Sequence, residues 1–381
     1  MAMTRRRMLG LVGGGVVLAA GAGTGWAMTR APMGAREPWA QAGAYDEPRM
    51  RALSWALLAP NPHNRQPWLA DLREEGVVTL RADLDRLLPE TDPMNRQITI
   101  GLGCFLELMR MAAAEDGYRV EVEPFPEGEE ARALDGRPVA RAVFVADPGV
   151  ARDPLFAWAS ERRSNKEPFD TGRSVEAEAM ARIGAVAGTA RFGATVEEGE
   201  VAALRALTRE ALRIEVETPH TFKESVDLFR IGRREIEADP DGIDFSGPLF
   251  EGLAAAGLMT REAMMDPTTM VFQAGLDAVH ANADTAMGHL WLVTAGNSRA
   301  EQLAAGADWV RVNLAATAEG LGVQPLSQAL QEFAEMAGPY AAVHERLAPD
   351  GGTVQMLARV GYGPTVPPSP RWPLDAKLVA A

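Results

Sequence analysis

Apolar and polar residues recur along the chain with periods that predict both helices and strands. In the first 150 residues, the apolar spacing predicts a helix over 48–58, and the nearly continuous apolar run 98–114 predicts a helix buried on most of its faces. Period-two patterns predict strands at 77–80, 119–124 and 139–145. A long core helix among strands favours an α+β sandwich.

The second part of the chain has a similar mixture of patterns. They predict helices at 176–187, 201–218 and 300–321, and strands at 190–196, 286–293 and 356–363. With 381 residues, 47% of them hydrophobic, the chain can build one large domain or two halves of ordinary size. We expect halves at 46–150 and 151–381.

Charge and cysteine content narrow the classes of partner. The formal net charge is -14, which argues against nucleic acid, because a phosphate backbone needs a basic surface. The single cysteine, Cys104, excludes a disulfide within the chain and a thiolate metal cluster, and its apolar surroundings predict a buried structural thiol. The scattered histidines have no metal-ligand spacing, so no metal site is predicted.

The N-terminal 30 residues resemble an export signal rather than part of the fold. A twin-arginine pattern at 4–9 precedes the weakly apolar, glycine-rich run 11–20, as in bacterial Tat signals. We therefore expect the Tat translocase as a partner during export and a periplasmic or other extracytoplasmic location. Cleavage after Ala27 would leave no stable membrane insertion, and an uncleaved anchor is the alternative.

The segment 161–170 concentrates candidate chemistry in the middle of the chain. Arg162, Arg163 and Lys166 lie with Ser164 directly after an apolar run, and Pro168 ends any helix before it. Arginines here can bind phosphate oxygens, and a lysine can place a charge beside a polarised ring, which suggests an anionic, ring-bearing cofactor. The alternative is a helix C-terminal turn whose cations remain solvated.

The spacing Arg162-x-Ser164-x-Lys166 resembles the flavin mononucleotide (FMN) signature of the nitroreductase family. A second stretch, 59–68, is similar to the loop that a nitroreductase partner subunit lays beside the flavin ring. The two motifs occur in reversed order, as in the Acg-like branch, where two nitroreductase-like halves are fused in one chain. The resemblance implies two α+β sandwich halves, a pseudo-dimer that shares one FMN site.

The same resemblance implies further cofactor-binding residues. In the segment 319–327, Pro325 and Leu326 stand where many active nitroreductases have a glutamate-glycine pair beside the flavin. Arg371, in the closing segment 367–374, is the candidate for a basic residue that reaches the phosphate, and an exposed tail arginine is the alternative. The implied cofactor-binding residues are Arg162, Ser164, Lys166, Pro62, His63, Asn64, Gln66, Pro325, Leu326 and Arg371.

Residues 219–273 are too long for an ordinary connection and are rich in phenylalanine and methionine. Such side chains suit a flat apolar ligand, so we interpret the segment as an insertion that folds over the flavin as a lid. The alternative is that it covers an ordinary surface or packs the two halves together.

The resulting hypothesis is an exported, FMN-dependent oxidoreductase. A small-molecule electron donor would reduce the flavin, and an electron-poor acceptor such as a nitro compound or quinone would reoxidise it. In this hypothesis no side chain needs to act as an acid or a base. Two alternatives remain: a non-catalytic protein that sequesters FMN, and a scaffold that binds no flavin.

Overall fold

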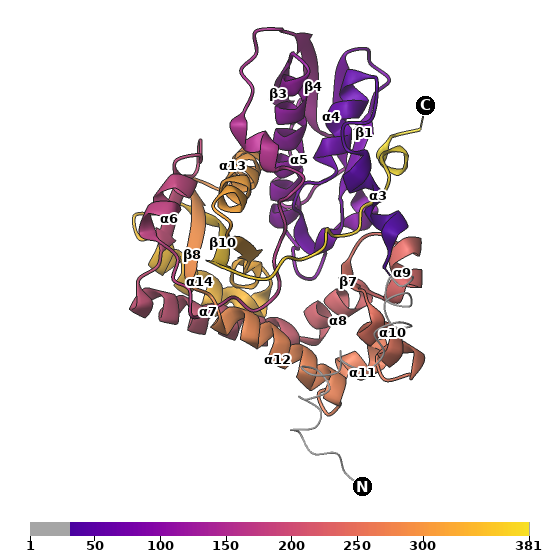
Figure 1. Cartoon of the computed structure of the whole chain (residues 1–381). Coiled ribbons are helices and arrows are strands. Elements are labelled where there is room, and N and C mark those ends of the chain that lie inside the picture. The colour runs from indigo at the N-terminus through magenta and orange to yellow at the C-terminus, as the bar shows by residue number, and fades with distance from the viewer. Residues whose placement is uncertain (1–30, 381) are drawn as a thin grey trace.

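A computed structural model describes residues 31–380, and the predicted export signal therefore lies outside the described residues. Two four-stranded antiparallel sheets, each with its own helices, stand on either side of a central pair of helices (Figure 1). The first half contains α4 (Pro48–Ala56), β1 (Trp68–Asp71), β2 (Val77–Ala82), α5 (Arg96–Glu115), β3 (Tyr118–Pro124) and β4 (Pro138–Ala146). The second half contains α6 (Ala177–Gly184), β5 (Arg191–Thr195), β8 (Gly288–Thr294), α13 (Arg299–Ala318), β9 (Gly322–Pro325), α14 (Ala337–Leu347) and β10 (Thr353–Gly361).

The two halves share one topology. The strand order is β1-β2-β4-β3 in the first sheet and β5-β8-β10-β9 in the second, so each sheet takes its strands in the order first, second, fourth, third. In both halves the long helix, α5 or α13, connects the second strand to the third. This repeat confirms the predicted fold class of two fused α/β sandwich halves.

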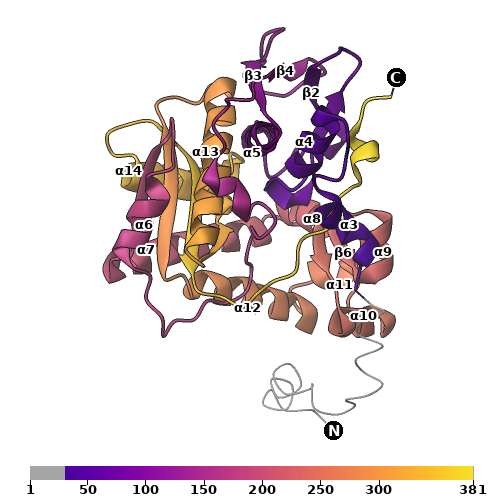
Figure 2. The same ribbon diagram turned by 45° about the horizontal axis from the view of Figure 1, so that its top comes forward.

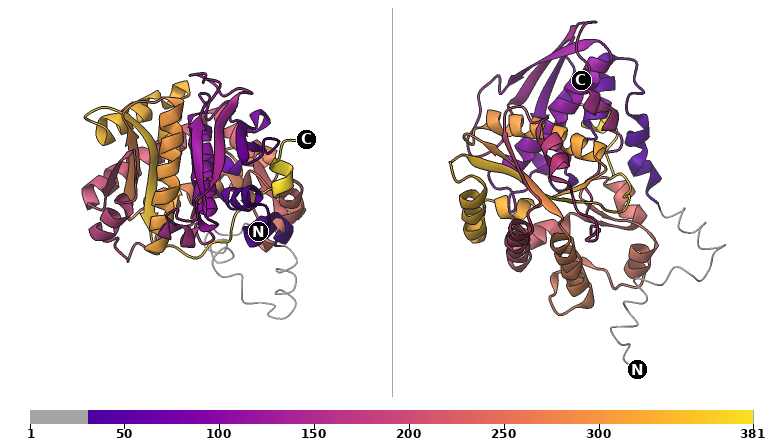
Figure 3. Two further views of the ribbon diagram at one scale, coloured as in Figure 1. Left: turned by 90° about the horizontal axis from the view of Figure 1, so that it is seen from above. Right: turned by 60° about the vertical axis from the view of Figure 1, so that its left-hand side comes forward.

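Helices α5 and α13 pack against each other where the halves meet, as the view from above shows (Figure 3). Glycines permit the close approach: a Cβ atom at Gly103 would lie 2.1 Å from the backbone oxygen of Leu303, and one at Gly306 would lie 2.1 Å from that of Ile100. The thiol of Cys104 is buried at this crossing and donates to the Gly306 carbonyl at 3.1 Å, as expected for a structural cysteine. In the described part of the chain, α5 is long and apolar enough to cross a membrane, but it is buried in this core.

The insertion lies within the connection from β5 to β8, at the place where the first half has only the short turn 72–76 between β1 and β2. This connection consists of α7 (Glu198–Glu217), α8 (Pro219–Asp227), β6 (Phe229–Ile231), α9 (Gly232–Ala238), β7 (Ile243–Phe245), α10 (Pro248–Ala255), α11 (Arg261–Met265) and α12 (Met270–Asp284). The elements α8 to α11 lie beneath the first half in Figure 1, far along the chain from the strands that they approach.

The two ends of the described chain pack together on the first half. After β10, the chain leaves the second half and runs toward the first, where Val379 N donates to Ala70 O at 2.9 Å (Figure 2). On the way, Arg371 N donates to Ala35 O at 2.7 Å, in the N-terminal helix α3 (Met33–Gln41). The C-terminal segment 362–380 therefore joins the halves and reaches the surroundings of the loop 59–68.

Candidate functional site

The segment that carries Arg162, Ser164 and Lys166 is extended and lies beside β9. The preceding helical turn, η3 (Pro154–Trp158), ends before the motif, as expected for a helix end that turns extended, but the alternative of solvated cations is wrong for the buried Arg162. Ser164 forms a parallel bridge with Val323, because Asn165 N donates to Val323 O at 2.9 Å. Pairing with β9 satisfies the backbone and leaves the Ser164 side chain exposed.

Glycines and a buried arginine hold this segment in place. A Cβ atom at Gly322 would lie 2.8 Å from the Phe169 ring, and one at Gly361 would lie 2.6 Å from it, so glycine is required where Phe169 packs on the strand ends. The Arg359 guanidinium stacks on the other side of the ring at 3.9 Å and donates to Glu167 O at 2.8 Å. Gly322 thus makes room for Phe169.

The loop 59–68 adopts an unusual backbone conformation. His63, Asn64 and Gln66 have φ of 48°, 52° and 52°, a left-handed region that costs energy for residues other than glycine. Gln66 is fully buried and holds the loop together: its amide donates to Pro240 O at 2.7 Å and its oxygen accepts from Trp372 N at 2.8 Å. Both polar atoms of the Gln66 side chain are therefore used within the protein. Direct contact of this side chain with a cofactor stays a prediction.

Three distant segments meet at the C-terminal end of α4. The carbonyls of Leu57, Leu58 and Ala59 have no partner within the helix and accept bonds from arginine side chains, as helix C-termini favour. Arg162 Nη2 donates to Leu58 O at 3.0 Å, and Arg371 donates to Leu57 O at 2.7 Å and to Ala59 O at 3.2 Å. The central motif, the loop and the C-terminal segment are therefore neighbours, and Arg371 is a buried residue of the site rather than an exposed tail arginine.

Arg371 also anchors the loop itself. Its Nη1 hydrogen-bonds Asn64 Oδ1, and Asn64 Nδ2 donates to Pro370 O at 3.0 Å. The guanidinium is thus surrounded by oxygen acceptors, all of them neutral. Its pKa is lowered to about 9, chiefly by burial and then by the positive charges of Arg162 and Arg163.

Arg162 carries buried donors without partners. Its Nε and Nη1 make no hydrogen bond within residues 31–380, although the side chain is only 3% exposed. Burial, and then the charge of Arg163, lower the pKa of Arg162 to about 10. A buried guanidinium with free N–H groups and a cationic neighbour is costly unless an anion binds it. These residues therefore fit the phosphate of a cofactor.

Lys166 and His63 lie close together beside these arginines. The charge of Lys166, after burial, helps to lower the pKa of His63 to about 4, so this imidazole is neutral at physiological pH. Solvent reaches the Lys166 side chain, yet the surrounding protein lowers its pKa as well. A ligand bound at this surface would therefore receive the charge of Lys166.

Pro325 and Leu326 follow directly along β9 from the residue that pairs with Ser164. Pro325 pairs with Ala358 of β10, and Leu326 N donates to Leu357 O at 2.8 Å. The Leu326 side chain is buried in the protein, at 2% exposure. The structure brings this segment next to the central motif, and contact of these two residues with a cofactor stays a prediction.

The insertion covers the loop 59–68 through buried ion pairs. Asp241 is 1% exposed and accepts from Arg65 at 2.7 Å, from Arg230 at 2.7 Å and also from Arg86. The expectation that its aromatic residues line a ligand site is wrong for three rings that pack edge-to-face in series within the insertion. These rings belong to Phe229, Phe245 and Phe250, and they form the insertion's own core with Val226, Ile231, Met259 and Met264.

Some residues of the site had no signal in the sequence. Trp39 in α3 stacks on the Arg163 guanidinium at 4.5 Å, and Asn282 in α12 donates to Lys166 O at 2.6 Å. Each belongs to a helix far along the chain from its partner. Only the folded arrangement identifies them, because no local pattern marks a tryptophan or an asparagine as a neighbour of the central motif.

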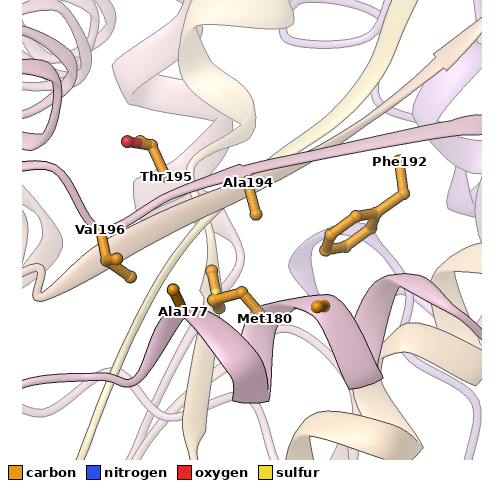
Figure 4. Close-up of a pocket in the computed structure, with 7 residues that line it drawn as sticks. Ala177, Met180, Phe192, Ala194, Thr195 and Val196 are labelled. Atoms are coloured by element: carbon orange, nitrogen blue, oxygen red, sulfur yellow. The ribbon is translucent and has the colours of Figure 1, made fainter.

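A separate cavity of about 290 Å³ lies between α6 and β5, and none of its lining residues belongs to either motif (Figure 4). It is lined by Ala177, Met180, Ala181, Phe192, Ala194, Thr195 and Val196. These side chains are apolar apart from one hydroxyl, and none is charged. The cavity lacks the groups that the central motif brings together, so the candidate site is at the arginines.

Fold and site together define a single-chain protein of two fused α/β sandwich halves with one arginine-rich site between them. No family model matches the chain. It is 30% identical over 340 residues to the Mycobacterium tuberculosis protein named "Putative NAD(P)H nitroreductase acg", covering 85% of this chain and 93% of that protein. The M. tuberculosis protein named "Putative NAD(P)H nitroreductase Rv3131" is 27% identical over 332 residues, which cover 84% of this chain and 87% of that protein. The chain belongs to the nitroreductase family.

Solved structures of single nitroreductases are more distant. A "putative nitroreductase" from Desulfovibrio desulfuricans, solved in complex with FMN, is 16% identical, with a TM-score of 0.32 over 61% of this chain and 98% of that one. The FMN-dependent nitroreductase NfnB from Mycobacterium smegmatis, solved with NADPH, is 16% identical, with a TM-score of 0.35 over 58% of this chain and 95% of that one. The family assignment rests on the sequence relatives.

Proposed function

We propose that this chain binds one FMN between its two halves and uses it as an oxidoreductase of nitroreductase type. The observation that carries the proposal is the buried guanidinium of Arg162, whose Nε and Nη1 have no partner in the described chain and which lies beside two further cations. A phosphate supplies the missing acceptors and the missing negative charge. The FMN-bound and NADPH-bound relatives support the choice of cofactor and donor class.

The residues of the chain would take distinct roles around the cofactor. Arg162 and Ser164 would bind the phosphate, and Arg371 would hold Arg162 and the loop in register while adding positive charge. Lys166 would stabilise negative charge that develops on the ring system. The loop residues Pro62, His63 and Asn64 would flank the ring. FMN itself supplies the hydride chemistry, and the protein orients the cofactor and excludes competing reactions.

Export by the Tat route belongs to the same proposal. The twin-arginine pattern at 4–9 and the apolar run 11–20 support it. Because Tat substrates cross the membrane already folded, a protein that loads FMN in the cytoplasm would use this route. The electron acceptor would be an electron-poor small molecule, nitro or quinone-like.

A non-catalytic protein that sequesters FMN is the second candidate function. The observation that favours it is the attachment of the insertion to the loop 59–68: Asp241 is buried among three arginines, and Gln66 is bonded to Pro240. An insertion held so firmly would restrict access of donors and acceptors to the ring. The replacement of the family's glutamate-glycine pair by Pro325 and Leu326 points the same way.

The absorbance spectrum of the purified protein tests these functions. After cytoplasmic expression, we expect flavin bands near about 370 and 450 nm, the region where flavin cofactors absorb. Anaerobic bleaching by NADH or NADPH would support the enzyme, and bleaching by dithionite alone would favour sequestration. A colourless protein that takes up no added FMN would refute both.

A further inference from the structure

A chain of hydrogen bonds leads from the candidate flavin site to a buried carboxyl group. His63 Nε2, in the loop, lies 3.2 Å from Ser225 Oγ in α8 of the insertion. Ser225 Oγ lies 3.2 Å from Glu215 Oε1 in α7, and Gln331 Nε2 donates to the other carboxyl oxygen of Glu215 at 2.9 Å. A hydroxyl group can donate to one neighbour while it accepts from the other, so the three side chains form a continuous path.

The two ends of this path have different surroundings. Ser225 and Glu215 are 5% and 6% exposed, and burial raises the pKa of Glu215, with a contribution from the negative charge of Glu224. His63 is partly exposed, and the positive charges that face it are those of Lys166 and Arg65. Within residues 31–380 nothing bonds to His63 Nδ1. One end is therefore a buried carboxyl group, and the other is a neutral imidazole beside Lys166 whose Nδ1 has no hydrogen-bond partner among the described residues.

The backbone of the loop turns the imidazole onto this path. His63 has a left-handed conformation, with φ of 48° and ψ of 20°. Hydrogen bonds of Arg371 to Asn64, and of Trp372 N to Gln66, hold the rest of the loop in place. Histidine is unfavourable in this conformation compared with glycine. Such strain at a non-glycine residue is common where a side chain must be aimed at a functional site.

We propose that Glu215, Ser225 and His63 form a proton-transfer chain that supplies a proton to the acceptor at the flavin site. The inference rests on the proposed function. When an acceptor is reduced at this site, for which bound FMN would supply the hydride, the Nδ1–H bond of His63 would break and its proton would go to the acceptor. Nε2 takes the Ser225 hydroxyl proton, and Ser225 Oγ takes the Glu215 carboxyl proton. His63 would then be neutral with its proton on Nε2, Ser225 would again carry one hydroxyl proton, and Glu215 would be a carboxylate. A solvent proton taken up at Nδ1 would send the Nε2 proton back through Ser225 to Glu215 and restore the starting state. His63 is thus the catalytic residue, and Ser225 and Glu215 act through it.

The test separates proton delivery from electron delivery in the FMN-loaded protein. Dithionite-reduced protein is mixed with p-benzoquinone, which takes up protons on reduction, and with ferricyanide, which takes up only electrons. Ser225→Ala interrupts the path, Ser225→Thr restores the hydroxyl, and Glu215→Gln keeps the shape of the carboxyl without its acidic proton. Glu217→Gln is the matched control, since Glu217 is two residues away on α7 and is exposed at the surface, where it pairs with Arg213.

We expect S225A and E215Q to slow reoxidation by p-benzoquinone at pH 7 about 100-fold, a typical effect of general acid catalysis, and to leave the ferricyanide rate within about twofold. S225T and E217Q should behave as the wild type. Independently of turnover, infrared spectra should show the carbonyl band of a protonated carboxyl group that E215Q lacks and that S225A and E217Q retain.

Several results would overturn the inference. One is an unchanged p-benzoquinone rate in either S225A or E215Q, when the flavin spectrum shows that the variant has folded. Another is an equal slowing with ferricyanide, which would place the effect on the flavin itself. A third is the absence of an infrared band specific to Glu215. A wild-type protein without flavin would instead refute the proposed function, and the proton chain with it.

Discussion

Replacement of Arg162 by methionine should separate cofactor binding from stability. The change keeps most of the volume and the apolar stem of the side chain while it removes the charge. In the cofactor-free protein it also removes the unpaired buried donors Nε and Nη1, at the cost of the bond from Nη2 to Leu58 O. We therefore expect Arg162→Met to lose FMN and to keep its fold.

The magnitudes follow from the surroundings of Arg162. Burial and the charge of Arg163 lower the pKa of Arg162 to about 10, against an ordinary value of about 12.5. At about 1.4 kcal/mol per unit, the charged group costs the fold about 3 kcal/mol below pH 10, and the penalty disappears only as the pH rises above that value. Loss of the bond to Leu58 O costs about 1.5–3 kcal/mol, so the two effects nearly cancel.

The effect on FMN affinity should be large by comparison. The two free N–H groups would each make a charge-assisted bond to phosphate, worth about 1.5–3 kcal/mol. Together they correspond to a loss of affinity of about 10²- to 10⁴-fold. Fluorescence titration with FMN measures this loss, and urea unfolding of the cofactor-free protein measures the stability.

Arg311→Met is the matched control. Although burial opposes it, hydrogen bonds to Asp153 and Glu107 raise the pKa of Arg311, so its charge stabilises the fold. Its removal should cost about 1–3 kcal/mol and leave FMN affinity unchanged. If Arg162→Met destabilises the cofactor-free protein more than Arg311→Met does, or keeps FMN affinity within about threefold, our account of the arginine site is wrong.

Three further predictions concern the fold. Gly306→Ala would bring a Cβ atom to 2.1 Å from Ile100 O and should lower the free energy of unfolding by about 2–4 kcal/mol. Gly275→Ala is the control: it lies in a helix interior with nothing within 4 Å of the added Cβ atom and should raise that free energy by up to about 1 kcal/mol. Equal shifts of the two variants in thermal melts would contradict the close crossing of α5 and α13. Burial lowers the pKa of His289 to about 3, so the stability of the wild type should fall as the pH drops below about 6.5. His289→Leu should remove about 1.4 kcal/mol per pH unit of that dependence, measured by urea unfolding between pH 6 and 4. Asp241→Asn should lower the free energy of unfolding by about 3–5 kcal/mol and speed trypsin cleavage within 219–273. An unchanged cleavage pattern would show that the ion pairs of Asp241 do not hold the insertion.

The sequence predicted what depends on local pattern. The apolar run at 98–114 became the core helix α5, and most strands appeared where period-two patterns placed them. The resemblance implied that the two motifs meet, and the structure brings them together: Arg162 bonds to Leu58 O, directly before the loop 59–68, and the charge of Lys166 acts on His63 in that loop.

What the sequence did not predict depends on contacts between distant segments. The strand β9 and the short strand β1 have little pattern of their own, and β9 exists because β10 pairs with it. The central motif has helical composition before it, but pairing of Ser164 with Val323 makes it extended. The insertion is rich in phenylalanine, and that composition suits a ligand site and a small core equally well. Only the folded arrangement of the rings distinguishes the two.

The two halves share one topology, and in our proposal they share one site, which has a consequence for how this protein behaves on dilution. In a dimer of separate subunits, a site at the interface is lost when the concentration falls below the dissociation constant. Here the segment 147–190 links the two sheets covalently, so assembly of the site is an intramolecular event with a fixed effective concentration. Single molecules should retain the complete site at any concentration. Each half is also free to diverge, since a substitution in one half alters only one side of one site.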